Sequence, residues 1–172
     1  MNPTKIETNA VNKLKVELER CENITTSITT NDKTPSFDGT ICLYHTTEIR
    51  KDNIKGNVNV QVKGKKVDKR DLKKKEISYP IEIADLRNFR TAGGTIFFVV
   101  YMEDMDNYKI YYNALVPLDL EEILNKVRDR QRTKNIKFEE FPQNDSRMVT
   151  YLLSNFIDDS RKLLLLPHDA QK

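Results

Sequence analysis

The chain has 172 residues and a formal net charge of +3, with 38% hydrophobic and 32% charged residues. The hydrophobic residues gather in runs such as 95–100 (TIFFVV), which is enough for a folded core and excludes global disorder. No apolar run reaches the roughly 18 residues of a membrane span, and the first residues lack the apolar stretch of a secretory signal, so we expect a cytoplasmic protein without a membrane partner.

The first half of the chain predicts one helix followed by three strands. Residues 6–21 carry apolar side chains at three- and four-residue spacing, which is typical of a helix. The β-branched residues of 23–32 and the alternating pattern of 37–45 predict two strands, and the alternating valines of 57–63 predict a third. Gly64 is expected to end the third strand, and the lysines after it are expected to form a loop.

The second half predicts further helices and strands in alternation. Pro80 begins a possible short strand or turn before the next helix. Further helices are predicted at 83–91, 118–132 and 146–166, and further strands at 95–102, 109–115 and 136–142. The strand at 95–102 is apolar on both faces, so we expect it in the middle of a sheet with 109–115 as its hairpin partner.

This order of elements predicts an α/β fold with a mixed sheet and helices on both faces. Residues 1–116 would form the core, and 117–172 would form a C-terminal helix-strand-helix extension that packs on the core or is used in assembly. The four leucines at 163–166 need cover. That cover could come from this domain, from a second copy in a homo-oligomer, or from an additional domain or subunit.

Polar residues on the third predicted strand suggest a chemical site. Alternate side chains of a strand point to opposite faces, so the valines of 57–63 share one face while Gln61 and Lys63 share the other. If the second and third strands form an antiparallel hairpin, Asp38 lies close to both polar residues. Mg²⁺ takes oxygen ligands, which Asp38, Gln61 and the backbone carbonyl of Val62 can supply. Lys63 can then position or deprotonate a water and offset charge on a phosphate, which is what hydrolysis of a phosphodiester requires.

A helix with a glutamate, an aspartate on the second strand, Gln-x-Lys on the third, then a helix and an apolar strand resembles the PD-(D/E)XK nuclease superfamily. The segments FDGTICLY, VNVQVKGK and IFFVVY…KIYYNAL carry this resemblance, which covers residues 5–116. The Gln-x-Lys form is similar to that of Mrr-type restriction endonucleases and of related domains in bacterial anti-phage defence. The resemblance implies a restriction-endonuclease-like fold with an αβββαβ core, DNA cleavage with Mg²⁺ or Mn²⁺, and active residues at Asp38, Gln61 and Lys63.

Families of this kind often also use a glutamate on the first helix. Glu7 suits that role best, because it lies one helical turn before Val11 on the apolar face. Glu17 is the next candidate, followed by Glu19. Gln61 stands where a typical nuclease carries an acid, so the site has less negative charge than the usual motif.

A basic run follows the third strand. Residues 63–75 contain eight lysines and arginines against two aspartates. Such a run fits either a solvated loop or a grip on the phosphate backbone of a nucleic acid. The predicted nucleic-acid-binding residues are Lys65, Lys66, Lys69, Arg70, Lys73, Lys74 and Lys75.

Several plainer interpretations stay open. Asp38 precedes a glycine in a common turn dipeptide, and Gln61 and Lys63 could form the solvated face of an ordinary strand. The fold could also serve as a non-catalytic nucleic-acid-binding module, or as an oligomerisation module that uses its C-terminal helices.

The remaining residues with metal-binding or redox chemistry fit no motif. Cys21 and Cys42 are too far apart for a metal motif and are expected to be reduced thiols, with a disulfide as the minor alternative. His45 and His168 have no partner at metal-ligand spacing, so we interpret both as structural or incidental.

Overall fold

The computed structural model describes residues 2–30 and 36–162. The leucines at 163–166 and His168 lie outside the described residues. Within them, the α-helices are α1 (Pro3–Glu19), α2 (Ile83–Thr91), α3 (Pro117–Asn125) and α4 (Ser146–Lys162). The strands are β1 (Ile24–Ile28), β2 (Gly39–Tyr44), β3 (Ile54–Lys66), β4 (Glu76–Glu82), β5 (Thr95–Met102), β6 (Tyr108–Leu115) and β7 (Thr133–Glu140). Two short 3₁₀ helices, η1 (Lys51–Asn53) and η2 (Lys69–Lys73), complete the assigned elements.

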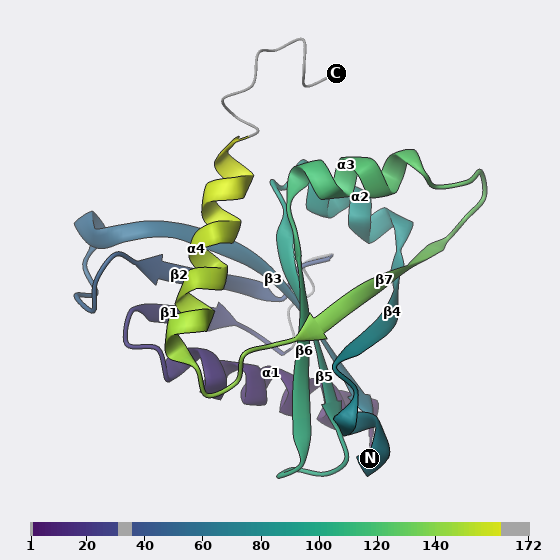
Figure 1. Cartoon of the computed structure of the whole chain (residues 1–172), viewed down its shortest axis with the longest axis horizontal. Coiled ribbons are helices and arrows are strands. Elements are labelled where there is room, and N and C mark those ends of the chain that lie inside the picture. Colours follow the sequence, from purple (N-terminus) through teal and green to yellow (C-terminus); the bar gives the residue numbers. More distant parts are fainter. Residues whose placement is uncertain (1, 31–35, 163–172) are drawn as a thin grey trace.

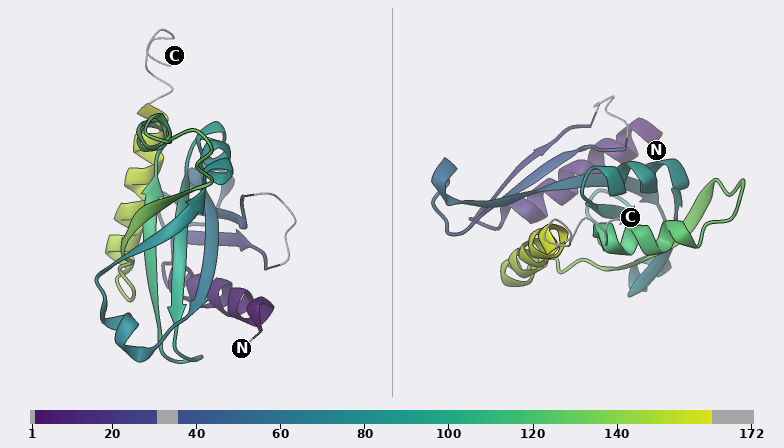
Figure 2. Two further views of the ribbon diagram at one scale, coloured as in Figure 1. Left: turned by 90° about the vertical axis from the view of Figure 1, so that its right-hand side faces the viewer. Right: turned by 90° about the horizontal axis from the view of Figure 1, so that it is seen from above.

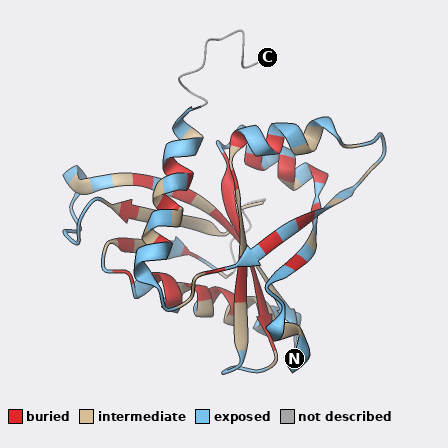
Figure 3. Cartoon of the chain, in the orientation of Figure 1, coloured by how far each residue is buried: buried red, intermediate tan, exposed pale blue. Residues whose placement is uncertain are grey.

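The strands form one seven-stranded mixed sheet in the order β1-β2-β3-β5-β6-β7-β4 (Figure 1). Only β3 and β5 pair in parallel among the described strands, and the other neighbours are antiparallel. All residues of β5 are buried (Figure 3), as its apolar sequence predicts for a central strand. The α/β class and the central β5–β6 hairpin are therefore confirmed.

The sheet has an apolar core on each face. One core combines the valines of β3 with apolar residues of α1 and α4. The other combines β5 with α2, α3 and the β4–β7 pair. Figures 1 and 2 show α2 and α3 side by side at one end of the molecule. None of the described helices is long and apolar enough to cross a membrane.

Strand β3 continues through Gly64, so the prediction that this glycine ends the strand is wrong. The first turns of α1 cross the strand at this position, and a Cβ on Gly64 would lie 2.8 Å from the carbonyl oxygen of Ile6 and 2.9 Å from the Cβ of Ala10. Glycine is therefore used here for close approach of helix and strand. Lys65 and Lys66 belong to the same strand and not to a loop.

Two other elements differ in extent from the sequence prediction. The short strand or turn expected to begin at Pro80 is the last part of the full edge strand β4, where Pro80 is tolerated because one side of an edge strand has no pairing partner. Helix α3 ends at Asn125 rather than at 132, because residues 128–132 (RDRQR) offer no apolar side chain to bury.

The described part of the C-terminal segment, residues 117–162, is closely integrated with the rest of the chain. Strand β7 lies between β6 and β4 and is the strand through which β4 joins the sheet. The inward side of α4 belongs to the same core as α1.

Candidate active site

Asp38 lies immediately before β2, at the point where pairing between β2 and β3 ends. Its backbone N–H donates to the carbonyl of Val60 at 2.9 Å. Its carboxylate oxygen Oδ2 accepts a hydrogen bond of 2.7 Å from the backbone N–H of Val62. The last register pair of the two strands is Gly39 with Val60, which puts Asp38 opposite Gln61. The carboxylate of Asp38 thus accepts the hydrogen bond that a backbone carbonyl would accept if the pairing with β3 continued, and this bond fixes its position.

Gln61 and Lys63 share the sheet face on which Asp38 lies, because opposed residues in a ladder point to the same side. Gln61 is only 7% exposed, and its side-chain amide makes no hydrogen bond to any of the described residues. Asn59, on the same face, is used structurally and donates to the carbonyl of Ala92 at 3.4 Å. Neither amide atom of Gln61 is a fully buried, unpaired atom, so the amide reaches solvent and is available to a ligand in a way that the amide of Asn59 is not.

The oxygen atoms at this position suit a hard cation. Asp38 offers a carboxylate and Gln61 an amide oxygen, and both are ligand types of Mg²⁺. The N–H of Val62 points to Asp38, so the carbonyl of Val62 points to the same open edge of β3. Among residues 2–30 and 36–162, no group of three or more His, Cys, Asp or Glu side chains could hold a metal. A metal site here would therefore depend on Gln61 and a backbone carbonyl in addition to carboxylates.

Helix α1 brings one of its glutamates to this end of β3. Glu7 is half-buried and follows Ile6, whose carbonyl lies against Gly64 directly after Lys63. Its negative charge also contributes to raising the pKa of Tyr79 on β4, after burial and the charge of Tyr101, although α1 itself packs on the opposite, valine-bearing face of β3.

The other two candidate glutamates have partners elsewhere. Glu17 is buried and accepts hydrogen bonds from the Tyr108 hydroxyl at 3.0 Å and the Asn144 N–H at 3.3 Å. Glu19 accepts a hydrogen bond from the Thr26 hydroxyl at 3.1 Å. Of the three glutamates considered on α1, Glu7 is therefore the one in the helical turn that crosses β3 at Gly64.

The segment before Asp38 is anchored to α2. The Ser36 hydroxyl donates to the carboxylate of Asp85, and the side-chain amide of Asn88 donates to the Ser36 hydroxyl at 2.9 Å. The ring of Phe37 packs edge-on against Phe89 with 5.5 Å between ring centres. These contacts join residues about fifty positions apart, and no local pattern in the sequence indicates them.

Tyr79 is a further residue near the site that sequence reasoning missed. Its ring centre lies 6.1 Å from that of Phe97, and Phe97 is the register partner of Gln61 on β5. Burial, together with the charges of Tyr101 and Glu7, raises the pKa of the Tyr79 hydroxyl. The alternation of Ile77, Tyr79 and Ile81 could have indicated an inward-facing tyrosine, had the strand been assigned.

The predicted nucleic-acid-binding residues are spread over three consecutive pieces of chain. Lys65 and Lys66 end β3 and are exposed. Lys69, Arg70 and Lys73 lie on η2, and Lys74 and Lys75 connect it to β4. The structure therefore presents the basic run from an ordered turn rather than from the loop that the sequence suggested.

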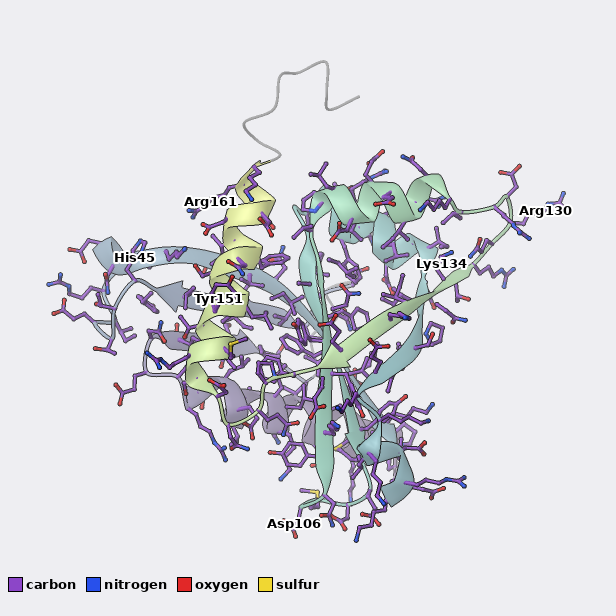
Figure 4. The ribbon with its side chains drawn as sticks, viewed as in Figure 1. His45, Asp106, Arg130, Lys134, Tyr151 and Arg161 are labelled. Atoms are coloured by element: carbon purple, nitrogen blue, oxygen red, sulfur yellow. The ribbon has the colours of Figure 1, made fainter. Side chains whose placement is uncertain are left out.

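Other residues with metal-binding or redox chemistry lie away from Asp38. His45 is at the distal end of the β2–β3 hairpin (Figure 4). Its backbone N–H donates to the carbonyl of Asn53. Cys21 and Cys42 are free thiols. Burial is the main cause of the raised pKa of the Cys21 thiol.

Comparison of the chain with protein-family models, with curated proteins and with solved structures found no match. The proposed function therefore rests on the residues of this site and their geometry.

Proposed function

We propose that the protein is a metal-dependent endonuclease that hydrolyses phosphodiester bonds in DNA. The observation that carries this proposal is the side-chain amide of Gln61, which has no hydrogen-bond partner among the described residues, opposite the carboxylate of Asp38, with Lys63 next on the same face. A side chain that the fold holds in place while its amide still reaches solvent can bond to a ligand, and a metal ion is one such ligand.

Each residue has a distinct role in this proposal. Asp38, Gln61, the carbonyl of Val62 and Glu7 would hold the ion. Bound Mg²⁺ or Mn²⁺ would polarise the scissile phosphate as a Lewis acid. Lys63 orients or deprotonates the attacking water and offsets charge that develops on the phosphate. The Val62 N–H fixes the carboxylate of Asp38, so that this acceptor is already in place when substrate arrives.

The choice of DNA and of biological setting rests on the resemblance and on charge. The basic residues from Lys65 to Lys75 follow the site directly and suit a phosphate backbone. The resemblance to Mrr-type endonucleases supports a restriction or anti-phage defence role. It also supports action as a homo-oligomer or together with an additional domain or subunit.

Plasmid cleavage with Mg²⁺ or Mn²⁺ tests the proposal. Asp38→Asn and Lys63→Gln should each lower the cleavage rate by about 10²–10³-fold, because each removes one charged member of the site. Asp52→Asn and Lys51→Gln, which make the same charge changes in the exposed η1 turn, are matched controls and should cleave normally. Full cleavage by both site variants would remove the assignment.

The alternative is a nuclease-like fold that binds nucleic acid without cutting it. The small number of carboxylates at the site favours this second candidate. It predicts DNA binding that weakens steeply with salt, and no cleavage with either ion. Light scattering on the intact chain would show separately whether the protein is an oligomer.

A further inference from the structure

A polar pocket lies directly beyond Lys63 along β3. Its volume is about 290 Å³, and it is lined by Lys65, Lys66, Val67, Asp68, Asp71, Lys74 and Tyr101. Lys65 follows Lys63 by two strand positions and therefore shares its face, with about 7 Å between the two Cα atoms. That distance is comparable to one nucleotide step between backbone phosphates.

The walls of this pocket are held in place by contacts from the sheet. The Tyr111 hydroxyl and the Lys109 ammonium both donate to the carbonyl oxygen of Lys74, at 2.7 Å and 2.9 Å. Val67 and Leu72 pack against the apolar core of the same sheet face. The segment from the end of β3 to the start of β4 is thus fastened at both ends, and its lysines are presented in a fixed arrangement.

The two acids of the pocket are each beside a basic side chain. The carboxylate of Asp71 lies 2.8 Å from the ammonium of Lys74. The carboxylate of Asp68 lies 3.7 Å from the guanidinium of Arg70. These pairs offset the negative charge inside the pocket, although both are exposed to solvent and contribute little to stability.

Lys65 and Lys66 supply the remaining charge. Neither has a carboxylate within ion-pair distance in the part of the chain that the structure describes. The Lys65 ammonium lies 5.7 Å from the centre of the Tyr101 ring, a cation–π contact that restrains its position without neutralising it. Among the described residues, Lys65 is therefore the ammonium without an ion-pair partner on the face of Lys63, whereas Lys66 alternates to the other face, where its charge acts on Asp104.

We infer that this pocket is a phosphate subsite, and that it holds the backbone phosphate next to the scissile one on the strand that is cut. The inference rests on the proposed function and deepens it, because it divides the basic run into the pocket residues Lys65 and Lys66, of which Lys65 would contact a defined phosphate, and the η2 residues Lys69 and Lys73, which do not line the pocket. Lysine ammonium groups are common phosphate ligands in proteins.

DNA binding without divalent ions tests the subsite separately from cleavage. Fluorescence anisotropy with a labelled DNA duplex compares the intact chain with Lys65→Gln/Lys66→Gln and with the matched control Lys69→Gln/Lys73→Gln. The pocket variant should bind about tenfold more weakly, and the slope of log affinity against log salt should fall by about one. The control, which removes the same charge, should change affinity less than about threefold. Equal weakening of both variants would show diffuse attraction and overturn the subsite.

A modified substrate then tests which phosphate is held. Once wild-type cut positions are mapped, a neutral methylphosphonate replaces the phosphate next to the cut, on one side and then on the other. Wild type should cut one of these substrates about tenfold more slowly, while the pocket variant should cut both at the rate of its unmodified substrate. Equal discrimination by wild type and pocket variant would overturn the inference.

The two proposals fail in different ways. If no wild-type cleavage occurs but the pocket variant alone loses DNA affinity, the nuclease fails and the pocket still binds phosphate. If cleavage depends on Asp38 but the pocket variant binds and discriminates like wild type, the subsite alone fails.

Discussion

The two ends of helix α1 hold glutamates in opposite situations. Glu17 is 4% exposed and is bound by Tyr108, by Asn144 and, at 3.6 Å, by Arg20. Glu7 is half-buried, has no hydrogen bond of this kind to the described residues, and lies in the helical turn that crosses β3 at Gly64.

This difference teaches how to separate structural from functional polar residues in the molecule. The cluster around Glu17 is closed, because its acid is saturated by donors from two distant parts of the chain and by Arg20 at the end of the same helix. The site at Gln61 is open, because its amide has no protein partner among the described residues and reaches solvent. Removing a member of the closed cluster should cost stability, whereas removing a member of the open one should cost activity.

The largest expected effect is on the closed cluster. Glu17→Ala should lower the free energy of unfolding by about 3 kcal/mol, because the Tyr108 hydroxyl and the Asn144 N–H would be left without their acceptor. Urea denaturation measures this change. Glu19→Ala, which removes one exposed hydrogen bond on the same helix, is the control and should cost less than about 1 kcal/mol. A cost for Glu17→Ala no larger than the control would remove the contrast.

The open end of the helix should respond in the reverse way. Glu7→Gln should change the free energy of unfolding by less than about 0.5 kcal/mol. Cleavage should fall about tenfold and require more Mg²⁺, because a carboxylate is replaced by a weaker neutral ligand. A titration of cleavage rate against Mg²⁺ concentration measures both effects, with Glu19→Gln as the matched control. If Glu7→Gln destabilises the fold while leaving cleavage per folded molecule unchanged, Glu7 is structural.

The sequence reveals features that depend on local alternation and order. The buried strand β5 and its hairpin with β6 follow from an apolar run, a turn and a second run. The placement of Asp38 opposite Gln61 follows from two adjacent strands whose register a single hairpin decides.

Features that depend on distant packing could not be predicted in the same way. The local sequence around Gly64 predicts the end of a strand, and only the crossing of α1 explains why this glycine lies inside β3. The contacts that close around Glu17 span 91 and 127 residues, and they separate it from Glu7 more clearly than any helical periodicity. The same holds for Ser36 and Asp85, which anchor the strand carrying the site.

The smallest expected effect is a change in the titration of Tyr108 in the closed cluster. Burial is the main cause of its raised pKa, and the hydrogen bond and charge of Glu17 raise it further, while Arg20 lowers it. A tyrosine whose folded pKa lies above its usual 10.0 favours the neutral hydroxyl in the folded protein. Its contribution to stability is therefore present below pH 10 and is lost as the pH rises through the folded pKa.

Glu17→Gln keeps an acceptor but removes the charge, so it should bring the pKa of Tyr108 closer to its usual value. The loss of stability would still begin near pH 10, but it would be smaller and would end at lower pH than in wild type. Tyrosinate absorbance, taken as a difference between each protein and the same protein carrying Tyr108→Phe, isolates this group from the other six tyrosines. An identical Tyr108 titration in both backgrounds would mean that Glu17 does not act on this hydroxyl. The cluster around Glu17 would then lack the electrostatic coupling that distinguishes it from the Glu7 end of α1.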